Sequence, residues 1–324
     1  MNHIQGLHHI TAIAGDAQEN LDFYNGVLGM RLVKRSVNQD DPTTYHLFYA
    51  DAEGHPGTDL TFFPWAHMER ARPGVGVTSE VQLAVPVGSL DYWQARLTDF
   101  EIDVDAVTTR FGNRVLTLRD PHGLSLALVE TSDVRVFTAW EDSPVPAAKQ
   151  ILGLHGARVV ERDLAATEGF ITETLGFQKL AEESGWHRYG LPAADGEVGG
   201  SGRVLELAED PAGRRGQWGV GGVHHLAWTV QDRAHELAVR ERIAAAGRRP
   251  TEVIDRFWFE SVYFSEPGGV LFELATKGPG FGIDEDAATL GERLILPPWL
   301  EPHRAQIEAA LPVLELAKRS EVEA

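Results

Sequence analysis

The sequence predicts an α+β fold in which four βαβββ modules pair into two half-open barrels. Three observations lead to this prediction: an internal repeat at one constant offset, the same order of strand and helix signals in each copy, and strands that are apolar on one face. A single sheet of this kind cannot cover its apolar face alone, so two modules are expected to curl together around a cavity. The repeat matches Gly6, Leu7, His8, Asp16, Phe23, Leu28 and Gly29 with Gly153, Leu154, His155, Asp163, Phe170, Leu175 and Gly176.

The first module shows the order of elements clearly. An alternating strand is followed by Asp16, which is placed to cap a helix, and Glu19 resembles the second half of a capping box. The helix is predicted to stop at Gly29, because glycine favours the left-handed conformation at a helix end. Turns rich in aspartate, proline and glycine then separate strands predicted at 31–37, 45–49 and 59–63.

The remaining modules follow the same pattern, with helices predicted at 90–97 and 233–246. The four modules are expected at 5–66, 78–133, 150–210 and 219–278. The predicted divisions are an N-terminal half (1–142), a linker (143–148), a C-terminal half (149–280) and a helical tail (281–324). A helix is predicted over 301–318 of the tail, which is interpreted as an element for packing or for a homo-oligomer.

Composition narrows the classes of partner. The net charge of −19 argues against nucleic acid, which needs clustered basic residues. The chain has no cysteine, so a metal must be held by histidine, aspartate or glutamate. No apolar run approaches about 18 residues, so no membrane span is expected. The N-terminus lacks the pattern of a secretory signal, and the expected location is the cytoplasm.

Two His-His pairs are the strongest functional signal. A single histidine is ordinarily a surface or hydrogen-bonded core residue, but these pairs open strands of the first and last modules. Alternate residues of a strand share a face. His9 and His225 then lie opposite uniformly apolar faces that are expected to pack under helices, so both should face the cavity.

Glu273 completes the candidate set. It lies between Phe272 and Leu274, where an unpaired carboxylate would be costly to bury, although an edge-strand glutamate in water is the ordinary alternative. Two histidines and one carboxylate leave open coordination positions on a metal. Because His9, His225 and Glu273 must converge, the first and last modules are expected to share one barrel.

The repeat also provides an internal control. At the position of His9, the second and third modules are interpreted to have Gln82 and Gly156. At the position of Glu273, the second module has Ala127, the third Glu206 and the first a residue near Thr61. The second cavity is therefore expected to be degenerate.

Taken together, these motifs resemble the vicinal-oxygen-chelate (glyoxalase/bleomycin resistance/dioxygenase) superfamily, and more closely the ring-cleaving dioxygenases that act on hydroquinones. The resemblance covers essentially the whole chain and includes GLHHIT, VHHLAW, DRFWFESVYF, LFELATKGPGF and LPPWLEPHR. It implies a glyoxalase/extradiol dioxygenase fold. It also implies an Fe(II) ion held by His9, His225 and Glu273, with Mn, Zn or Ni as substitutes in purified protein.

The same resemblance implies a reaction and further site residues. It implies opening of a hydroquinone-like or catechol-like ring with O2. The implied catalytic residues are His8, His224, Arg256 and Tyr263, and Thr11 is the implied substrate-binding residue. Strand alternation places His8 and His224 on the face away from the ligands, so they can reach the cavity only through a bend in the strand or a neighbouring group. A structural hydrogen-bonding role stays open for His8, His224, Arg256 and Tyr263.

Two other interpretations of function stay open. A glyoxalase-type isomerase or lyase using Ni or Zn would need a fourth protein ligand that can act as a base, and Thr61 is a poor one. A non-catalytic binding or resistance protein of the same fold would need no metal, which leaves the triad unexplained.

Overall fold

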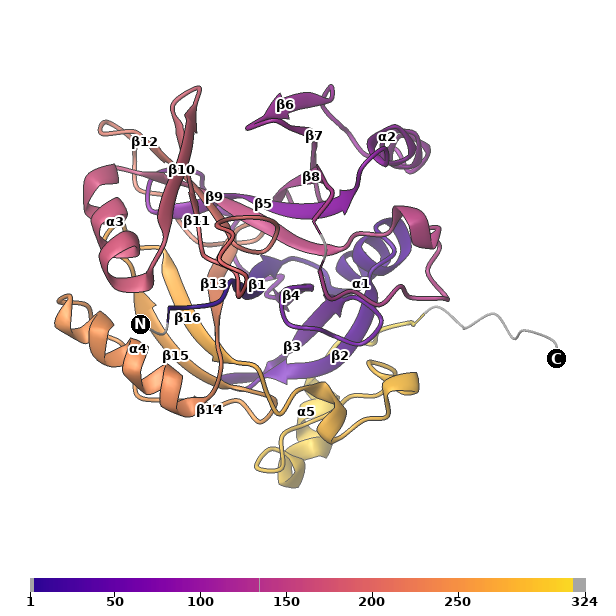
Figure 1. The fold of residues 1–324 in the computed structure, drawn as a ribbon. Helices are drawn as coiled ribbons and strands as arrows, with labels where there is room; N and C mark the ends of the chain where they lie inside the picture. The colour runs from indigo at the N-terminus through magenta and orange to yellow at the C-terminus, as the bar shows by residue number, and fades with distance from the viewer. Residues whose placement is uncertain (1–2, 134, 317–324) are drawn as a thin grey trace.

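The computed structural model describes residues 3–133 and 135–316, which form two curled eight-stranded sheets (Figure 1). The first sheet has the strand order β14 (Ile254–Asp255), β15 (Glu260–Ser265), β16 (Leu271–Thr276), β13 (Val223–Val230), β1 (Leu7–Ala14), β4 (Asp59–Pro64), β3 (Asp41–Ala50) and β2 (Arg31–Asn38). The second has the order β10 (Gln178–Glu183), β11 (Trp186–Gly190), β12 (Val204–Glu209), β9 (Gly153–Glu161), β5 (Val77–Pro86), β8 (Ser125–Thr131), β7 (Asn113–Arg119) and β6 (Thr108–Arg110).

This strand order confirms the α+β fold of two half-open barrels. Strands of the first and last modules share one sheet, joined where β1 and β13 pair antiparallel, and the two middle modules share the other through β5 and β9. At the centre of each half-barrel, the two paired strands therefore come from segments that are distant in the chain. The arrangement brings residues of β1, β13 and β16 next to each other.

Both repeated helices combine an α-helical and a π-helical turn. Asp16 and Asp163 accept hydrogen bonds from the first-turn amides of α1 (Ala17–Leu21) and α3 (Leu164–Phe170). Each helix continues as a π-helix, η1 (Asp22–Val27) and η3 (Ile171–Leu175). Gly29 and Gly176 then take positive φ values of 68° and 93°, as expected of glycine after a helix end.

The other helices flank the sheets. They are α2 (Leu90–Asp99), α4 (Arg233–Ala245) and α5 (Arg304–Ala310), with 3₁₀ turns η2 (Ala147–Lys149), η4 (Phe281–Ile283), η5 (Ala287–Thr289) and η6 (Glu301–His303). The helix predicted over 301–318 is wrong in extent: it ends at Ala310, because Pro312 disfavours helical geometry at Leu311 before it. The end of that prediction, from residue 317, lies outside the described residues. None of the described helices combines the length and apolar character of a membrane span.

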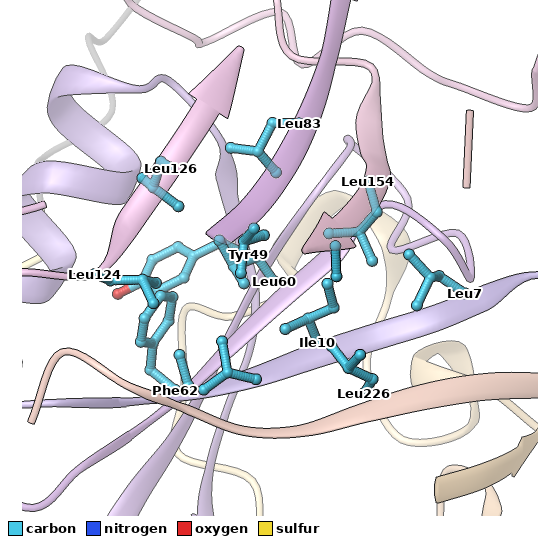
Figure 2. Close-up of a cluster of buried hydrophobic side chains, with 14 of the residues drawn as sticks. Leu7, Ile10, Tyr49, Leu60, Phe62, Leu83, Leu124, Leu126, Leu154 and Leu226 are labelled. Carbon is cyan, nitrogen blue, oxygen red and sulfur yellow. The ribbon is translucent and has the colours of Figure 1, made fainter. Parts of the chain in front are cut away.

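The main core lies between the sheets. Figure 2 shows side chains of both sheets meeting in one buried cluster, with Ile10 and Leu226 from the first and Leu83 and Leu154 from the second. The prediction that these apolar strand faces pack under helices is therefore only partly right. Helix α4 does pack on β13, β15 and β16, but much of the apolar face of the first sheet is covered by the second sheet.

Candidate metal centre

His9, His225 and Glu273 converge on the inner face of the first sheet. In the register of the strands, His9 lies opposite Ala227, and Ala227 is the neighbour of Glu273 across β13 and β16. One potential ligand atom from each of the three residues lies within 4.8 Å of the others, and all three side chains are buried. The strand alternation inferred from the sequence therefore brings together the predicted triad.

The separations between these atoms suit a shared metal ion. His9 Nε2 lies 3.2 Å from His225 Nε2 and 3.2 Å from Glu273 Oε2, and His225 Nε2 lies 2.8 Å from Glu273 Oε2. Ligands about 2.1 Å from one ion and at right angles to each other would be separated by about 3.0 Å. The donors therefore fit three adjacent positions around an ion, with the other positions left for reactants.

The ionisation states of the triad also suit a cation. Burial alone would raise the pKa of Glu273, but His9 and His225 lower it well below its usual value. Burial lowers the pKa of His225, which favours the neutral imidazole. Within the part of the chain that the structure describes, Glu273 Oε2 is fully buried without a well-formed hydrogen bond. A carboxylate and neutral imidazole are the protonation states that bind metals.

Neighbouring side chains fix the orientation of both histidines of the triad. His8 Nδ1 lies 3.0 Å from His9 Nδ1, and His224 Nδ1 lies 2.8 Å from His225 Nδ1. Both contacts occupy the nitrogen that faces away from the centre, so each Nε2 is directed inward. Hydrogen bonds to the distal nitrogen of a histidine ligand commonly set its orientation.

The two preceding histidines differ in their access to the site. The pairing of β1 with β13 shifts between Leu7 and His9, which supplies the bend that His8 needs to reach its neighbour. His224 lines the cavity and stacks on Trp218 with ring centroids 4.6 Å apart, whereas His8 does not line the cavity. Burial lowers the pKa of both histidines to about 3.

A cavity of about 290 Å³ opens over the triad. Its apolar walls include Phe48, Phe63, Trp258 and Phe259. A planar ring fits such a wall better than a flexible polar chain does.

Arg256 and Tyr263 form one polar side of the cavity. Arg256 lies between β14 and β15, and its guanidinium lies 5.6 Å from the Tyr263 ring centroid. Its Nη2 donates to Asp40 Oδ2 at 2.9 Å, in the turn between β2 and β3. Burial and the charge of Glu273 raise the pKa of Tyr263, so its phenol keeps its proton. Both residues, which the resemblance implied to be catalytic, line the cavity.

Thr11 lies below the cavity surface and is absent from its lining. Its Oγ1 lies 2.7 Å from Thr61 Oγ1, and both threonines are fully buried. Thr61 lies opposite Thr11 just as Glu273 lies opposite Ala227, so it occupies the counterpart of Glu273 in the first module. The sequence analysis missed His46, which lines the cavity and contacts Thr61.

The tail contributes to the cavity indirectly. Trp258 Nε1 donates to Asp284 Oδ2 at 2.9 Å, and the buried Lys34 ammonium bonds to Asp284 at 2.7 Å and also to Glu285. The tail therefore does more than the packing that was predicted for it, because its Asp284 also holds the cavity residue Trp258 in place. Lys34, in the middle of β2, gave no signal because its partners are about 250 residues away in the chain.

In the second half-barrel, an arginine occupies the place that corresponds to the metal centre. Arg158 Nε donates to Glu206 Oε2 at 2.6 Å and lies 3.6 Å from Glu80 Oε1. Arg188 and Arg110 complete the charge network by pairing with Glu206 and Glu80, respectively. Burial would raise the pKa of Glu206, but Arg158 and Arg188 lower it below its usual value.

The register corrects one assignment made from the sequence. Glu80 pairs with Arg158 as His9 pairs with Ala227, so Glu80 is the counterpart of His9. The assignment of Gln82 to that position was wrong by two residues, because the strand contains no histidine or glycine to mark the register. The assignments of Ala127 and Glu206 agree with the pairing of their strands.

The fold and site together define a class of protein: a double half-barrel of duplicated βαβββ modules with a potential three-ligand metal centre in one half. The profile of the Glyoxalase/Bleomycin resistance protein/Dioxygenase superfamily matches residues 6–128 and 153–274, and the chain belongs to this superfamily.

Individual relatives narrow the class further. The chain is 42% identical over 306 residues to MhqO of Bacillus subtilis (strain 168), which is assigned as a ring-cleaving dioxygenase, and the match covers 94% of this chain and 95% of MhqO. It is 33% identical to a chlorohydroquinone/hydroquinone 1,2-dioxygenase of Sphingobium indicum, with 92% and 93% of the two chains covered. A crystal structure of a Bacillus subtilis protein assigned as a dioxygenase matches with a TM-score of 0.90 and 40% identity, covering 98% of this chain and all of that one. The protein is thus an enzyme of the ring-cleaving dioxygenase type.

Proposed function

We propose that the protein is an Fe(II)-dependent, extradiol-type dioxygenase that opens hydroquinone-like or catechol-like rings with O2. The observation that carries the proposal is the convergence of His9, His225 and Glu273, of which the two histidines line an aromatic-walled cavity. The names of the relatives support the choice of aromatic diols as substrates. Two histidines and a carboxylate with open positions are the ligand set typical of non-haem Fe(II) oxygenases.

In this proposal, Fe(II) would supply activation of O2 and would lower the pKa of a coordinated hydroxyl group. His9, His225 and Glu273 hold the ion, and His8 and His224 keep the two imidazoles in position. The aromatic walls orient the substrate ring and exclude water from it.

The polar residues of the cavity handle charge and protons. Tyr263 keeps its proton and can donate a hydrogen bond to an oxygen that becomes negative. Arg256 stabilises negative charge on the same side of the cavity. His224 is the histidine beside the ligands that reaches the cavity, and it is proposed to relay protons there. Thr11 is proposed to act indirectly, by holding Thr61 in place beside the cavity residue His46.

The test is anaerobic loading with Fe(II), followed by oxygen uptake with a panel of hydroquinones and catechols. The expected result is one O2 consumed per diol and a product whose mass is increased by both oxygen atoms. A loaded protein that consumes no O2 with any diol, but isomerises a thiohemiacetal, would instead support glyoxalase chemistry. Thr61 speaks against that alternative, because the hydroxyl in place of a fourth ligand is a weak base.

A further inference from the structure

His46 is a polar residue inside the cavity for which the roles described so far give no use. It lies on β3, with its ring between Phe48 and Phe63 at centroid distances of 3.8 and 4.4 Å. Its Nε2 lies 2.9 Å from Thr61 Oγ1. The two aromatic rings and the hydroxyl hold the imidazole in one orientation.

The position of His46 follows from the duplication of the modules. Ser261 and His46 occupy corresponding places, each two residues before the one that pairs with Glu273 or Thr61. In the last module, the small Ser261 bonds to the long ligand Glu273, at 2.6 Å. In the first module the sizes are reversed, and the large imidazole of His46 reaches over the short Thr61. His46 thus brings a nitrogen base to the side of the cavity where the fourth ligand is missing.

The hydrogen bonds that Thr61 makes with Thr11 and with His46 Nε2 leave the other nitrogen of His46, Nδ1, available. Thr61 has one proton and makes two contacts, to Thr11 and to His46. When it donates to Thr11, it accepts from His46 Nε2–H, and Nδ1 then carries the lone pair. Among the described residues, Nδ1 has no hydrogen-bond partner and is not one of the fully buried unpaired atoms, so it is accessible from the cavity. Burial, followed by the charges of His9 and His225, lowers the pKa of His46 well below its usual value, which favours the neutral ring.

We propose that His46 is a catalytic residue that binds, through Nδ1, the substrate hydroxyl that points away from the metal and accepts its proton during ring oxidation. This inference rests on the proposed function. In the sheet, β3 is separated from the ligand strand β1 by β4. Neighbouring strands are about 4.8 Å apart. Two such spacings put the backbones of β1 and β3 about 9.6 Å apart. The cavity between their side chains is lined by His9, His225 and His46, so it can take a para-dihydroxybenzene with one oxygen at the metal centre and the other at His46.

The proton balance is closed within the site. The O–H bond of the distal hydroxyl breaks and an N–H bond forms at Nδ1, while the electron pair stays on the oxygen and enters the ring. The ring is oxidised and O2, the co-substrate, is reduced, with both oxygen atoms entering the product. Since O2 adds to the diol without net loss of hydrogen, the imidazolium returns its proton to the product. Throughout, Nε2–H remains bonded to Thr61.

The experiment compares hydroquinone with 4-methoxyphenol, in which the distal hydroxyl is capped, as ligands of the Fe(II)-loaded protein under anaerobic conditions. Trp65 and Trp258 line the cavity, so tryptophan fluorescence reports binding. The wild-type protein is expected to bind hydroquinone roughly 5- to 10-fold more tightly, as one hydrogen bond would give. His46→Phe keeps a ring between Phe48 and Phe63 and is expected to lose this preference while retaining its metal.

Turnover supplies a second measurement. His46→Phe is expected to lower kcat/KM for hydroquinone by roughly 100-fold or more, the range for a lost proton acceptor. His55→Phe is the matched control, because His55 bonds to Asp51 outside the cavity, and it should retain both preference and turnover.

The outcomes separate this proposal from the proposed function. A His46→Phe protein that keeps both the ligand preference and turnover overturns the role of His46, and so does equal weakening of both ligands, which would indicate packing alone. If the loaded wild type binds hydroquinone but consumes no O2, the proposed function fails, while the ligand comparison still tests recognition by His46.

Discussion

Ser261 Oγ donates a hydrogen bond of 2.6 Å to Glu273 Oε1, so the carboxylate is held from the neighbouring strand while Oε2 is directed at His9 and His225. Ser261→Ala is expected to weaken metal binding by about 10- to 100-fold, the usual effect of losing a residue that orients a ligand. Metal affinity can be measured by competition with a chelator. Ser265→Ala, in the same strand but exposed, is the control. Unchanged affinity in Ser261→Ala would show that the carboxylate is held by other contacts.

Removing a histidine of the triad tests the centre directly. His225→Ala is expected to abolish metal retention and oxygen uptake, because two ligands are left to hold the ion. Elemental analysis and an oxygen electrode give the two measurements. His122→Ala and His155→Ala should keep the wild-type metal content, since neither residue belongs to the triad. Full activity in His225→Ala would contradict the assignment of the site.

The charge network of the second half-barrel predicts a different effect. Glu206→Gln should leave metal content unchanged but lower the free energy of unfolding by about 3–5 kcal/mol, because it leaves buried arginine charges without their main partner. Urea denaturation followed by circular dichroism measures the change. Loss of metal in this variant, with the fold intact, would indicate that the metal lies in the second half-barrel and would contradict the assignment to the triad.

Glu236 on α4 predicts a pH dependence of stability. Its carboxylate is fully buried and has no hydrogen-bond partner among the described residues. Burial, then the charges of Glu260 and Glu273, raises its pKa to about 8. The folded state therefore holds the proton more tightly than the unfolded state. The favourable contribution is complete below the unfolded pKa of about 4.3 and is lost as the pH rises through about 8.

Glu236→Gln removes this titration. The variant is expected to melt a few degrees higher than the wild type at pH 8.5, with a smaller difference at pH 5. Thermal melts at the two pH values, at one ionic strength, give the comparison. A difference between the proteins that does not change with pH would rule out Glu236 as its source.

Much of the fold could be predicted because the chain repeats itself. Constant spacing between Gly6 and Gly153 and between Asp16 and Asp163 identified the module, and strand alternation selected His9 and His225 from the two His-His pairs. These features depend on local spacing. The pairing of the first and last modules followed from one further condition, that three ligands must share one ion.

The features that were missed depend on side chains meeting across distant parts of the chain. His46 is one histidine in an ordinary strand, and its importance arises from Thr61 on the next strand and the reversal of residue sizes between modules. Lys34 has its partners in the tail. The register error at Gln82 arose because a shift by two residues keeps the same strand face, so alternation alone cannot detect it.

Because Arg158 is part of the chain, the second half-barrel needs no dissolved ion for its central positive charge, whereas the first would need one under the proposed function. In the second, the positive charge that holds Glu80 and Glu206 together is part of the polypeptide, whereas in the first the proposed ion would hold one carboxylate and two imidazoles at the equivalent places. Under the proposed function, a cell short of metal, or a buffer containing a chelator, would remove the charge from the first half-barrel only. Under the proposed function, loss of the ion would therefore remove activity while the ion pairs of Arg158 stay in place.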